Sequence, residues 1–142
     1  MKKEWKKLIE EARKVRENAY APHSKFKVGA AVLTKSGRIY TGCNVENASF
    51  SIGICAERNA ISNAIANGEK EIEVVAVVAD TDPFTPPCGA CRQFIQEFGP
   101  SAKVILANLN GKTKIYTQKQ LLPYPFNFSL VEKSKKKIKH CE

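Results

Sequence analysis

The spacing of apolar residues along the chain predicts alternating helices and strands. Over residues 3–17 they recur at three- and four-residue steps, the pattern of an amphipathic helix, and Pro22 prevents its continuation. Residues 72–79 form a near-continuous apolar run, which is typical of a strand buried on both faces. By the same reasoning we expect helices at 3–17, 55–67, 89–98 and 118–122, and strands at 25–34, 38–44, 72–79, 103–109 and 113–116.

This order of elements predicts a layered α/β fold. A buried strand between two helices requires helices on both faces of the sheet, so we expect a three-layer α/β/α sandwich around a mixed five-stranded sheet. The sheet is mixed because turns at Ser36-Gly37 and Asn110-Gly111 signal antiparallel hairpins. With 142 residues and no linker, the chain is expected to form a single domain over residues 1–131. The lysine-rich segment 132–142 is expected to be a disordered tail.

Composition and charge narrow the classes of protein. The charged N-terminus lacks the apolar stretch of a signal peptide, and no apolar run reaches the roughly 18 residues that span a bilayer. We therefore expect a cytoplasmic protein without membrane contact. The net charge of +9 suggests nucleic-acid binding, but residues 1–16 contribute +4 and residues 132–142 contribute +3, which leaves +2 for the body. Charge confined to the two ends favours a solvated surface, so no nucleic-acid partner is expected.

Two cysteine-containing segments carry the candidate chemistry. Cys55-Ala56-Glu57 begins one predicted helix, and Pro87-Cys88-Gly89-Ala90-Cys91 begins the next one, across the buried strand. In a cytoplasmic protein, cysteines at C-x-x-C spacing are typical of zinc ligands, and helix N-termini favour the thiolate that zinc binds. Cys55, Cys88 and Cys91 are therefore predicted to hold one Zn²⁺ per subunit.

The lack of a well-spaced fourth ligand predicts a catalytic rather than a structural zinc. Cys43 lies on a predicted strand and Cys141 in the basic tail, so neither is placed to close the coordination. An open position would hold a water, and Glu57 follows Cys55 closely enough to take a proton from it. Arg58 is expected to offset the negative charge of three thiolates. A Cys-x-Glu helix start followed about 30 residues later by Pro-Cys-x-x-Cys is the pattern of zinc-dependent deaminases.

Several short stretches of the chain match one enzyme family. They are Ser24-Lys-Phe-Lys-Val-Gly-Ala-Ala31, Gly42-Cys-Asn-Val-Glu-Asn-Ala48, Cys55-Ala-Glu-Arg-Asn-Ala60, Pro87-Cys-Gly-Ala-Cys-Arg-Gln93 and Leu121-Leu-Pro123 with Phe126. On these residues the chain resembles the short, homotetrameric cytidine deaminases, over roughly residues 5–128. The resemblance implies hydrolytic deamination of free cytidine and deoxycytidine to uridine and deoxyuridine plus ammonia, as in pyrimidine salvage. Zinc-bound hydroxide would attack C4 of the base, and a glutamate would shuttle the protons.

The resemblance also implies a set of substrate contacts. Phe26 would pack against the pyrimidine ring, while Asn44 and Glu46 would bind the ribose 3′-hydroxyl. Ala56 would use its backbone, and Glu57 its carboxylate, to read the edge of the base. A carboxylate at the 3′-hydroxyl would repel a phosphate there, so free nucleosides are the expected substrates.

The resemblance extends to the assembly, with two departures from the family pattern. Phe126 would reach into a neighbouring subunit's site, so a homotetramer is expected. Position 50 is Phe where many relatives have Tyr, which removes a hydroxyl that could bond at the subunit interface or near the ligand. Tyr124-Pro125 replaces small residues that are common before the terminal Phe, and this affects the path expected for Phe126.

Three other functions are open from the sequence. A relative that deaminates a cytosine-bearing antibiotic of the blasticidin type would need a ribose-contact segment different from residues 44–46. A non-catalytic zinc module or RNA-binding protein would use the basic termini and treat the thiolates as structural. A polynucleotide editor would have to place a 3′-phosphate beside Glu46. Turnover of cytidine, and its dependence on Glu57, separates the enzyme from the binding module.

Overall fold

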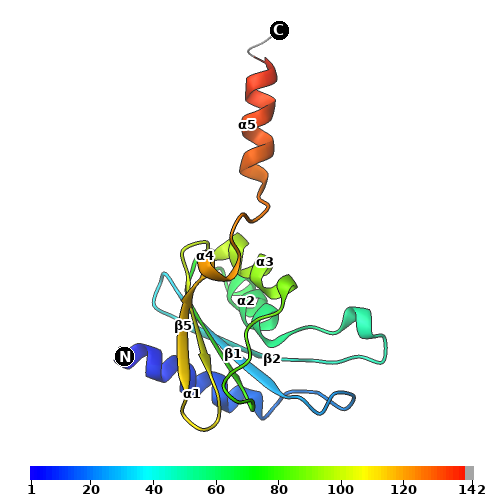
Figure 1. The fold of residues 1–142 in the computed structure, drawn as a ribbon, viewed down its shortest axis with the longest axis vertical. Coiled ribbons are helices and arrows are strands. Elements are labelled where there is room, and N and C mark those ends of the chain that lie inside the picture. Colours follow the sequence, from blue (N-terminus) through cyan, green and yellow to red (C-terminus); the bar gives the residue numbers. More distant parts are fainter. Residues whose placement is uncertain (140–142) are drawn as a thin grey trace.

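A computed structural model describes residues 1–139 of the chain. Five strands lie between two layers of helices, and the N- and C-terminal helices lie on different parts of the molecule (Figure 1). The strands are β1 (Val28–Thr34), β2 (Ile39–Cys43), β3 (Ile72–Ala79), β4 (Lys103–Ala107) and β5 (Thr113–Thr117). The helices are α1 (Lys3–Arg16), the 3₁₀ turn η1 (Phe50–Ile52), α2 (Ala56–Ala66), α3 (Gly89–Phe98), α4 (Gln118–Leu121) and α5 (Phe128–Lys139).

The sheet has the order β2-β1-β3-β4-β5 and is mixed, as predicted. Strands β3 and β4 run parallel, whereas the other three neighbouring pairs run antiparallel. A parallel pair needs a crossover connection, and α3 supplies it between β3 and β4. Helix α3 packs on the same face of the sheet as α2, since Ile95 of α3 and Ile61 of α2 belong to one buried cluster.

Alternate residues of the central strand face opposite helical layers. Val74 and Ala76 of β3 share a buried cluster with Leu8 of α1. Val75, between them, belongs to a second buried cluster with Ile61 of α2. A strand with apolar residues on both faces therefore holds helices against both sides of the sheet, which confirms the three-layer α/β/α sandwich.

Helix α2 lies unusually close to the sheet at Gly42 of β2. A Cβ atom on this glycine would stand 2.3 Å from the backbone nitrogen of Ala60 and 2.8 Å from the carbonyl oxygen of Ala56. Both atoms belong to the backbone of α2, so no side chain can move aside to make room. The absence of a side chain at position 42 therefore sets how deeply the first turns of α2 sit on the sheet.

Replacing Gly42 by alanine is expected to lower the free energy of unfolding by about 1–3 kcal/mol, because α2 must shift away from β2. Urea denaturation of the purified variant measures this change. Gly89→Ala is the matched control, since a Cβ atom there would meet nothing within 4 Å. Equal unfolding midpoints for the two variants would show that the close approach at Gly42 does not matter.

The first strand begins later than the apolar pattern predicts. We expect it from Lys25, but β1 starts at Val28 because Lys25 adopts a left-handed backbone conformation with φ of 60°. The turn formed by residues 21–24 is followed by an irregular stretch up to Lys27. The turn carries Ser24 to the site and the irregular stretch carries Phe26, so neither residue lies on a strand.

The C-terminal segment, for which the composition predicts a disordered tail, is helical up to Lys139. Helix α5 covers residues 132–139 of that tail and extends away from the rest of the molecule (Figure 1), while residues 140–142 lie outside the described part of the chain. Lysine has a high intrinsic helix propensity, and the hydroxyl of Ser134 donates to the carbonyl of Leu130 one turn earlier. The charge of this segment predicts disorder, whereas its helix propensity favours the helix observed. Over residues 1–139, no helix combines the length and the apolar content required to cross a membrane.

Candidate active site

Three cysteines from two helix starts come together on one side of the sheet. Cys55 is the residue immediately before the first turn of α2, and Cys88 occupies the same position on α3. Cys91 lies in the first turn of α3 and is fully buried. The three Sγ atoms all lie within 4.8 Å of one another, with 3.9 Å between those of Cys55 and Cys88. This cysteine cluster (Cys55, Cys88 and Cys91) has the composition that the sequence predicts.

The geometry of the cysteine cluster suits a zinc ion. Zinc–sulfur bonds of about 2.3 Å in a tetrahedron place neighbouring sulfurs about 3.8 Å apart, close to the separation of Cys55 and Cys88. Neither of these two sulfurs is used to cap its own helix. Among residues 1–139, Cys43 is the remaining cysteine and lies outside the cluster, and Cys141 lies beyond the described residues. Within the described part of the chain, residues 1–139, these three sulfurs thus form a group that suits one zinc ion.

The pKa values of two thiols in the cysteine cluster are shifted by their neighbours. The thiol of Cys91 hydrogen-bonds to Cys55 and lowers the pKa of Cys55 to about 5, and the guanidinium of Arg58 contributes to the same shift. Nη2 of Arg58 lies 3.6 Å from Sγ of Cys55 and 3.3 Å from the carbonyl oxygen of Gly53. The bond to Cys55 and burial raise the pKa of Cys91. The surroundings of Cys55 therefore favour its thiolate, the form of cysteine that zinc binds.

The carboxyl group of Glu57 is buried beside the cysteine cluster. Glu57 is the second residue of α2 and only 4% exposed. Burial raises the pKa of its carboxyl, and the nearby charge of Cys55 acts in the same direction. A carboxyl group with a raised pKa takes up and releases a proton closer to neutral pH than an exposed glutamate does. Glu57 thus has the position and the ionisation expected of a proton carrier.

A cavity of about 310 Å³ connects the cysteine cluster with the segments that precede β1 and follow β2. This volume is in the range of pockets that bind small molecules. Its wall includes all the predicted base, sugar and catalytic contacts of this chain except Phe126. The lining residues are Ser24, Phe26, Val28, Asn44, Glu46, Cys55, Ala56, Glu57, Val77, Thr85, Pro86 and Cys88.

The side-chain amide of Asn44 ties the end of β2 to the stretch before β1. Its Nδ2 donates to the carbonyl of Phe26 at 2.8 Å, and its Oδ1 accepts from the backbone N–H of Val28 at 2.8 Å. These two bonds place Phe26 at the cavity wall. One N–H and one lone pair of the amide stay available for a ligand, so positioning of Phe26 adds to the sugar contact expected from the sequence.

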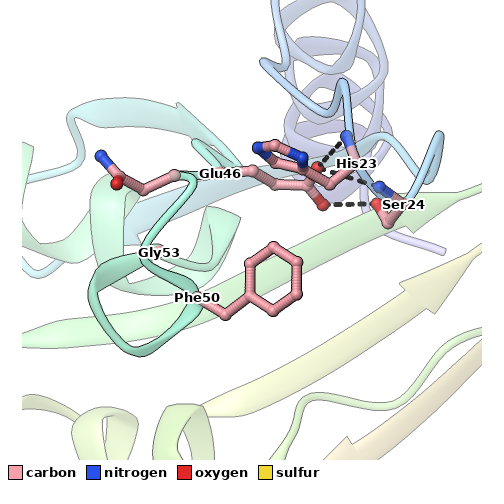
Figure 2. Close-up of a pocket in the computed structure, with 6 residues that line it drawn as sticks. His23, Ser24, Glu46, Phe50 and Gly53 are labelled. Carbon is pink, nitrogen blue, oxygen red and sulfur yellow. Dashed lines mark hydrogen bonds between the residues drawn. The ribbon is translucent and has the colours of Figure 1, made fainter.

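Glu46 stands where the cavity adjoins a second hollow, drawn in Figure 2. Its Oε1 accepts from the backbone N–H groups of His23 at 2.9 Å and Ser24 at 3.1 Å, and its Oε2 accepts from the hydroxyl of Ser24 (Figure 2). The bonds from Ser24 lower the pKa of Glu46, so its carboxylate is charged at neutral pH. The second hollow has a volume of about 360 Å³ and is also lined by Phe50. The ring centroids of Phe50 and His23 lie 5.5 Å apart.

Phe126 does not reach the cavity of its own chain. Phe126 is 58% exposed, and the centroid of its ring lies 5.4 Å from that of Phe128. Its backbone carbonyl accepts a hydrogen bond from Nε2 of Gln93 on α3. The preceding Tyr124 has φ of 54° and is fully exposed, so the departure noted in the sequence falls at an irregular turn. The structure thus separates Phe126 from the other predicted contacts.

The sequence assigns no site role to five residues of the cavity wall: Ser24, Val28, Val77, Thr85 and Pro86. Ser24 begins a stretch that matches the family, but its side chain has no partner that can be read from the sequence. Thr85 and Pro86 belong to a proline-rich loop just before Cys88, and that short distance from a ligand is the signal that could have placed them.

Fold and site together define a zinc-binding α/β/α domain whose metal group adjoins a ligand cavity and a buried carboxyl. A family model described as "Cytidine and deoxycytidylate deaminase zinc-binding region" matches residues 2–107. The chain therefore belongs to the cytidine and deoxycytidylate deaminase family.

Individual relatives agree with this assignment. A cytidine deaminase from Sporosarcina psychrophila is 50% identical over 122 residues, which cover 85% of this chain and 90% of that protein. A probable cytidine deaminase from Dictyostelium discoideum is 40% identical over 141 residues, or 98% of this chain and 95% of that protein. The crystal structure of cytidine deaminase from Burkholderia pseudomallei matches with a TM-score of 0.84 at 45% identity, covering 89% of this chain and 100% of that chain.

Proposed function

We propose that this chain is a zinc-dependent enzyme that hydrolyses the 4-amino group of free cytidine and deoxycytidine, giving uridine or deoxyuridine and ammonia. The observation that carries the proposal is the buried carboxyl of Glu57 beside the cysteine cluster, on one wall of a cavity of nucleoside size. A structural zinc site would need neither the cavity nor a titratable group held next to the metal position.

The cavity residues orient the nucleoside. Phe26 packs against the pyrimidine ring, and the backbone of Ala56 faces the edge of the base. The charged carboxylate of Glu46 accepts a hydrogen bond from the 3′-hydroxyl, assisted by the free positions of the Asn44 amide. These contacts hold C4 of the base toward the cysteine cluster.

Proton transfer is assigned to Glu57. Cys55, Cys88 and Cys91 would hold a zinc ion, which would supply Lewis-acid activation of the attacking water, and Arg58 offsets part of the thiolate charge there. Glu57 takes a proton from that water and delivers it to N3 of the pyrimidine as the new C4–O bond forms. Glu57 then carries the proton of the new C4 hydroxyl to the amino nitrogen. The C4–N bond breaks, ammonia leaves, and the C4 carbonyl forms.

The proposal includes a homotetramer that acts in pyrimidine salvage in the cytoplasm. Support for an oligomer comes from Phe126, which is exposed and lies away from the cavity of its own chain. Large exposed apolar side chains are also frequent at subunit interfaces, and this chain carries Phe50, Ile52, Tyr124 and Phe128 in addition.

Loss of the cytosine absorbance band and release of ammonia test the proposed activity. We expect turnover of cytidine and deoxycytidine by the zinc-loaded protein, and a rate with cytidine 3′-phosphate at least about tenfold lower, because its phosphate meets the Glu46 carboxylate. Absence of ammonia with both nucleosides would overturn the proposed function. Equal rates for cytidine and its 3′-phosphate would remove the sugar contact from Glu46 but leave the reaction standing.

A further inference from the structure

We propose that Ser24 is a positioning residue for sugar recognition, whose hydroxyl holds the Glu46 carboxylate and the Phe26 backbone in one fixed arrangement. The inference rests on the proposed function, because it explains how that site presents its sugar-binding group. It adds a residue that touches neither the cysteine cluster nor Glu57.

The hydroxyl of Ser24 has two partners within the site. It donates its hydrogen to Oε2 of Glu46 and accepts the backbone N–H of Phe26 at 3.0 Å. A serine hydroxyl has one hydrogen to donate, so its donor capacity is fully used. One small group therefore connects the residue assigned to the sugar with the residue assigned to the base.

Counting the acceptor positions of Glu46 shows what the arrangement leaves open. A carboxylate offers about four lone-pair positions. Oε1 receives two backbone N–H groups, from His23 and Ser24, and Oε2 receives only the serine hydroxyl. The free position is therefore on Oε2, and a charged acceptor there requires a ligand that brings a hydrogen-bond donor, such as a neutral hydroxyl.

The serine hydroxyl supplies a constraint that the backbone bonds do not. Two N–H groups on Oε1 hold that atom in place but allow the carboxylate plane to rotate about it. The bond from Ser24 to Oε2 fixes the second oxygen. Figure 2 shows the hydrogen bonds from His23 and Ser24 to the two oxygens of the Glu46 carboxylate. Ser24 and Glu46 line both the cavity and the second hollow, so this orientation decides which oxygen faces the nucleoside.

The test compares Ser24→Ala with Ser24→Thr on cytidine and on 3′-deoxycytidine. Ser24→Ala is expected to raise KM for cytidine about tenfold, the effect of a weakened hydrogen bond to a charged group, with kcat changed less than twofold. KM for 3′-deoxycytidine should rise by less than about threefold, because that substrate makes no bond to Glu46 and feels only the loss of the bond to the Phe26 backbone. Ser24→Thr keeps the hydroxyl and should restore the cytidine KM to within about twofold of wild type.

A matched control removes a different serine–glutamate bond. Oγ of Ser36 donates to Oε1 of Glu69 at 2.6 Å, in a turn that does not line the cavity, so Ser36→Ala should leave both KM values unchanged. Equal losses for Ser24→Ala on the two substrates, or a threonine variant as impaired as the alanine variant, would overturn the role of Ser24. Failure of the wild-type protein to act on cytidine would instead overturn the proposed function itself.

Discussion

Replacing Glu57 by glutamine is expected to lower kcat for cytidine by about 10⁴-fold while the protein keeps its zinc and its fold. Glutamine has nearly the same shape as glutamate, but its amide cannot accept the proton of the attacking water or pass it to N3. Burial already disfavours the charged form of Glu57, so a neutral amide at this position should not destabilise α2. Absorbance kinetics, metal analysis and thermal unfolding of one preparation measure the three quantities.

The control for this variant is Glu73→Gln on β3, an exposed glutamate remote from the cavity, which should keep wild-type turnover. Wild-type activity in Glu57→Gln would remove the proton carrier from the mechanism. Loss of zinc from Glu57→Gln would show instead that the carboxyl binds the metal, in which case the open fourth position does not exist.

Replacing Cys88 by alanine is expected to abolish zinc retention and to reduce cytidine turnover below detection. Two sulfurs remain, and they do not hold the metal against dialysis at neutral pH. Cys88 is exposed, so the change leaves no large cavity in the core and its effect comes through the metal. The variant should also lose the rise in melting temperature that added zinc causes in the wild-type protein, because zinc binds the folded state.

Cys43→Ala is the matched control for the metal. Cys43 is a half-buried free cysteine outside the cysteine cluster, so its removal should leave zinc content and turnover unchanged. A Cys88→Ala protein with one zinc per chain and full activity would contradict the three-sulfur site. The same readouts with Cys43→Ala show whether any metal loss is specific to the cluster.

Local patterns in the sequence carry most of the fold and the metal-binding group. The predicted helix 89–98 and strand 72–79 coincide with α3 and β3, because an apolar run between turn signals depends on neighbours in the chain. Cys55 and Cys88 each precede a helix, and a helix start is itself a local property. Once two such starts are predicted across one buried strand, the meeting of three sulfurs follows from the layered fold.

The sugar side of the cavity could not be read in the same way. Ser24 and Glu46 are 22 positions apart, and their bond depends on how the turn before β1 lies against the segment after β2. Asn44 has the composition of a ligand contact, yet the structure uses its amide to hold Phe26 and Val28 as well. Hydrogen bonds between loops leave no period or motif in the sequence, because each depends on the three-dimensional path of both segments.

Patterns among near neighbours in the chain are enough to predict the order of helices and strands, the three zinc-binding sulfurs and the carboxyl that follows Cys55 by two residues. The burial of Glu57, the close approach of α2 at Gly42 and the bond from Ser24 to Glu46 become visible only in the folded chain. The difference lies in the range of the interactions. Helix starts and strand patterns arise from residues close together in the chain, whereas burial and cavity shape arise from segments that only folding brings into contact.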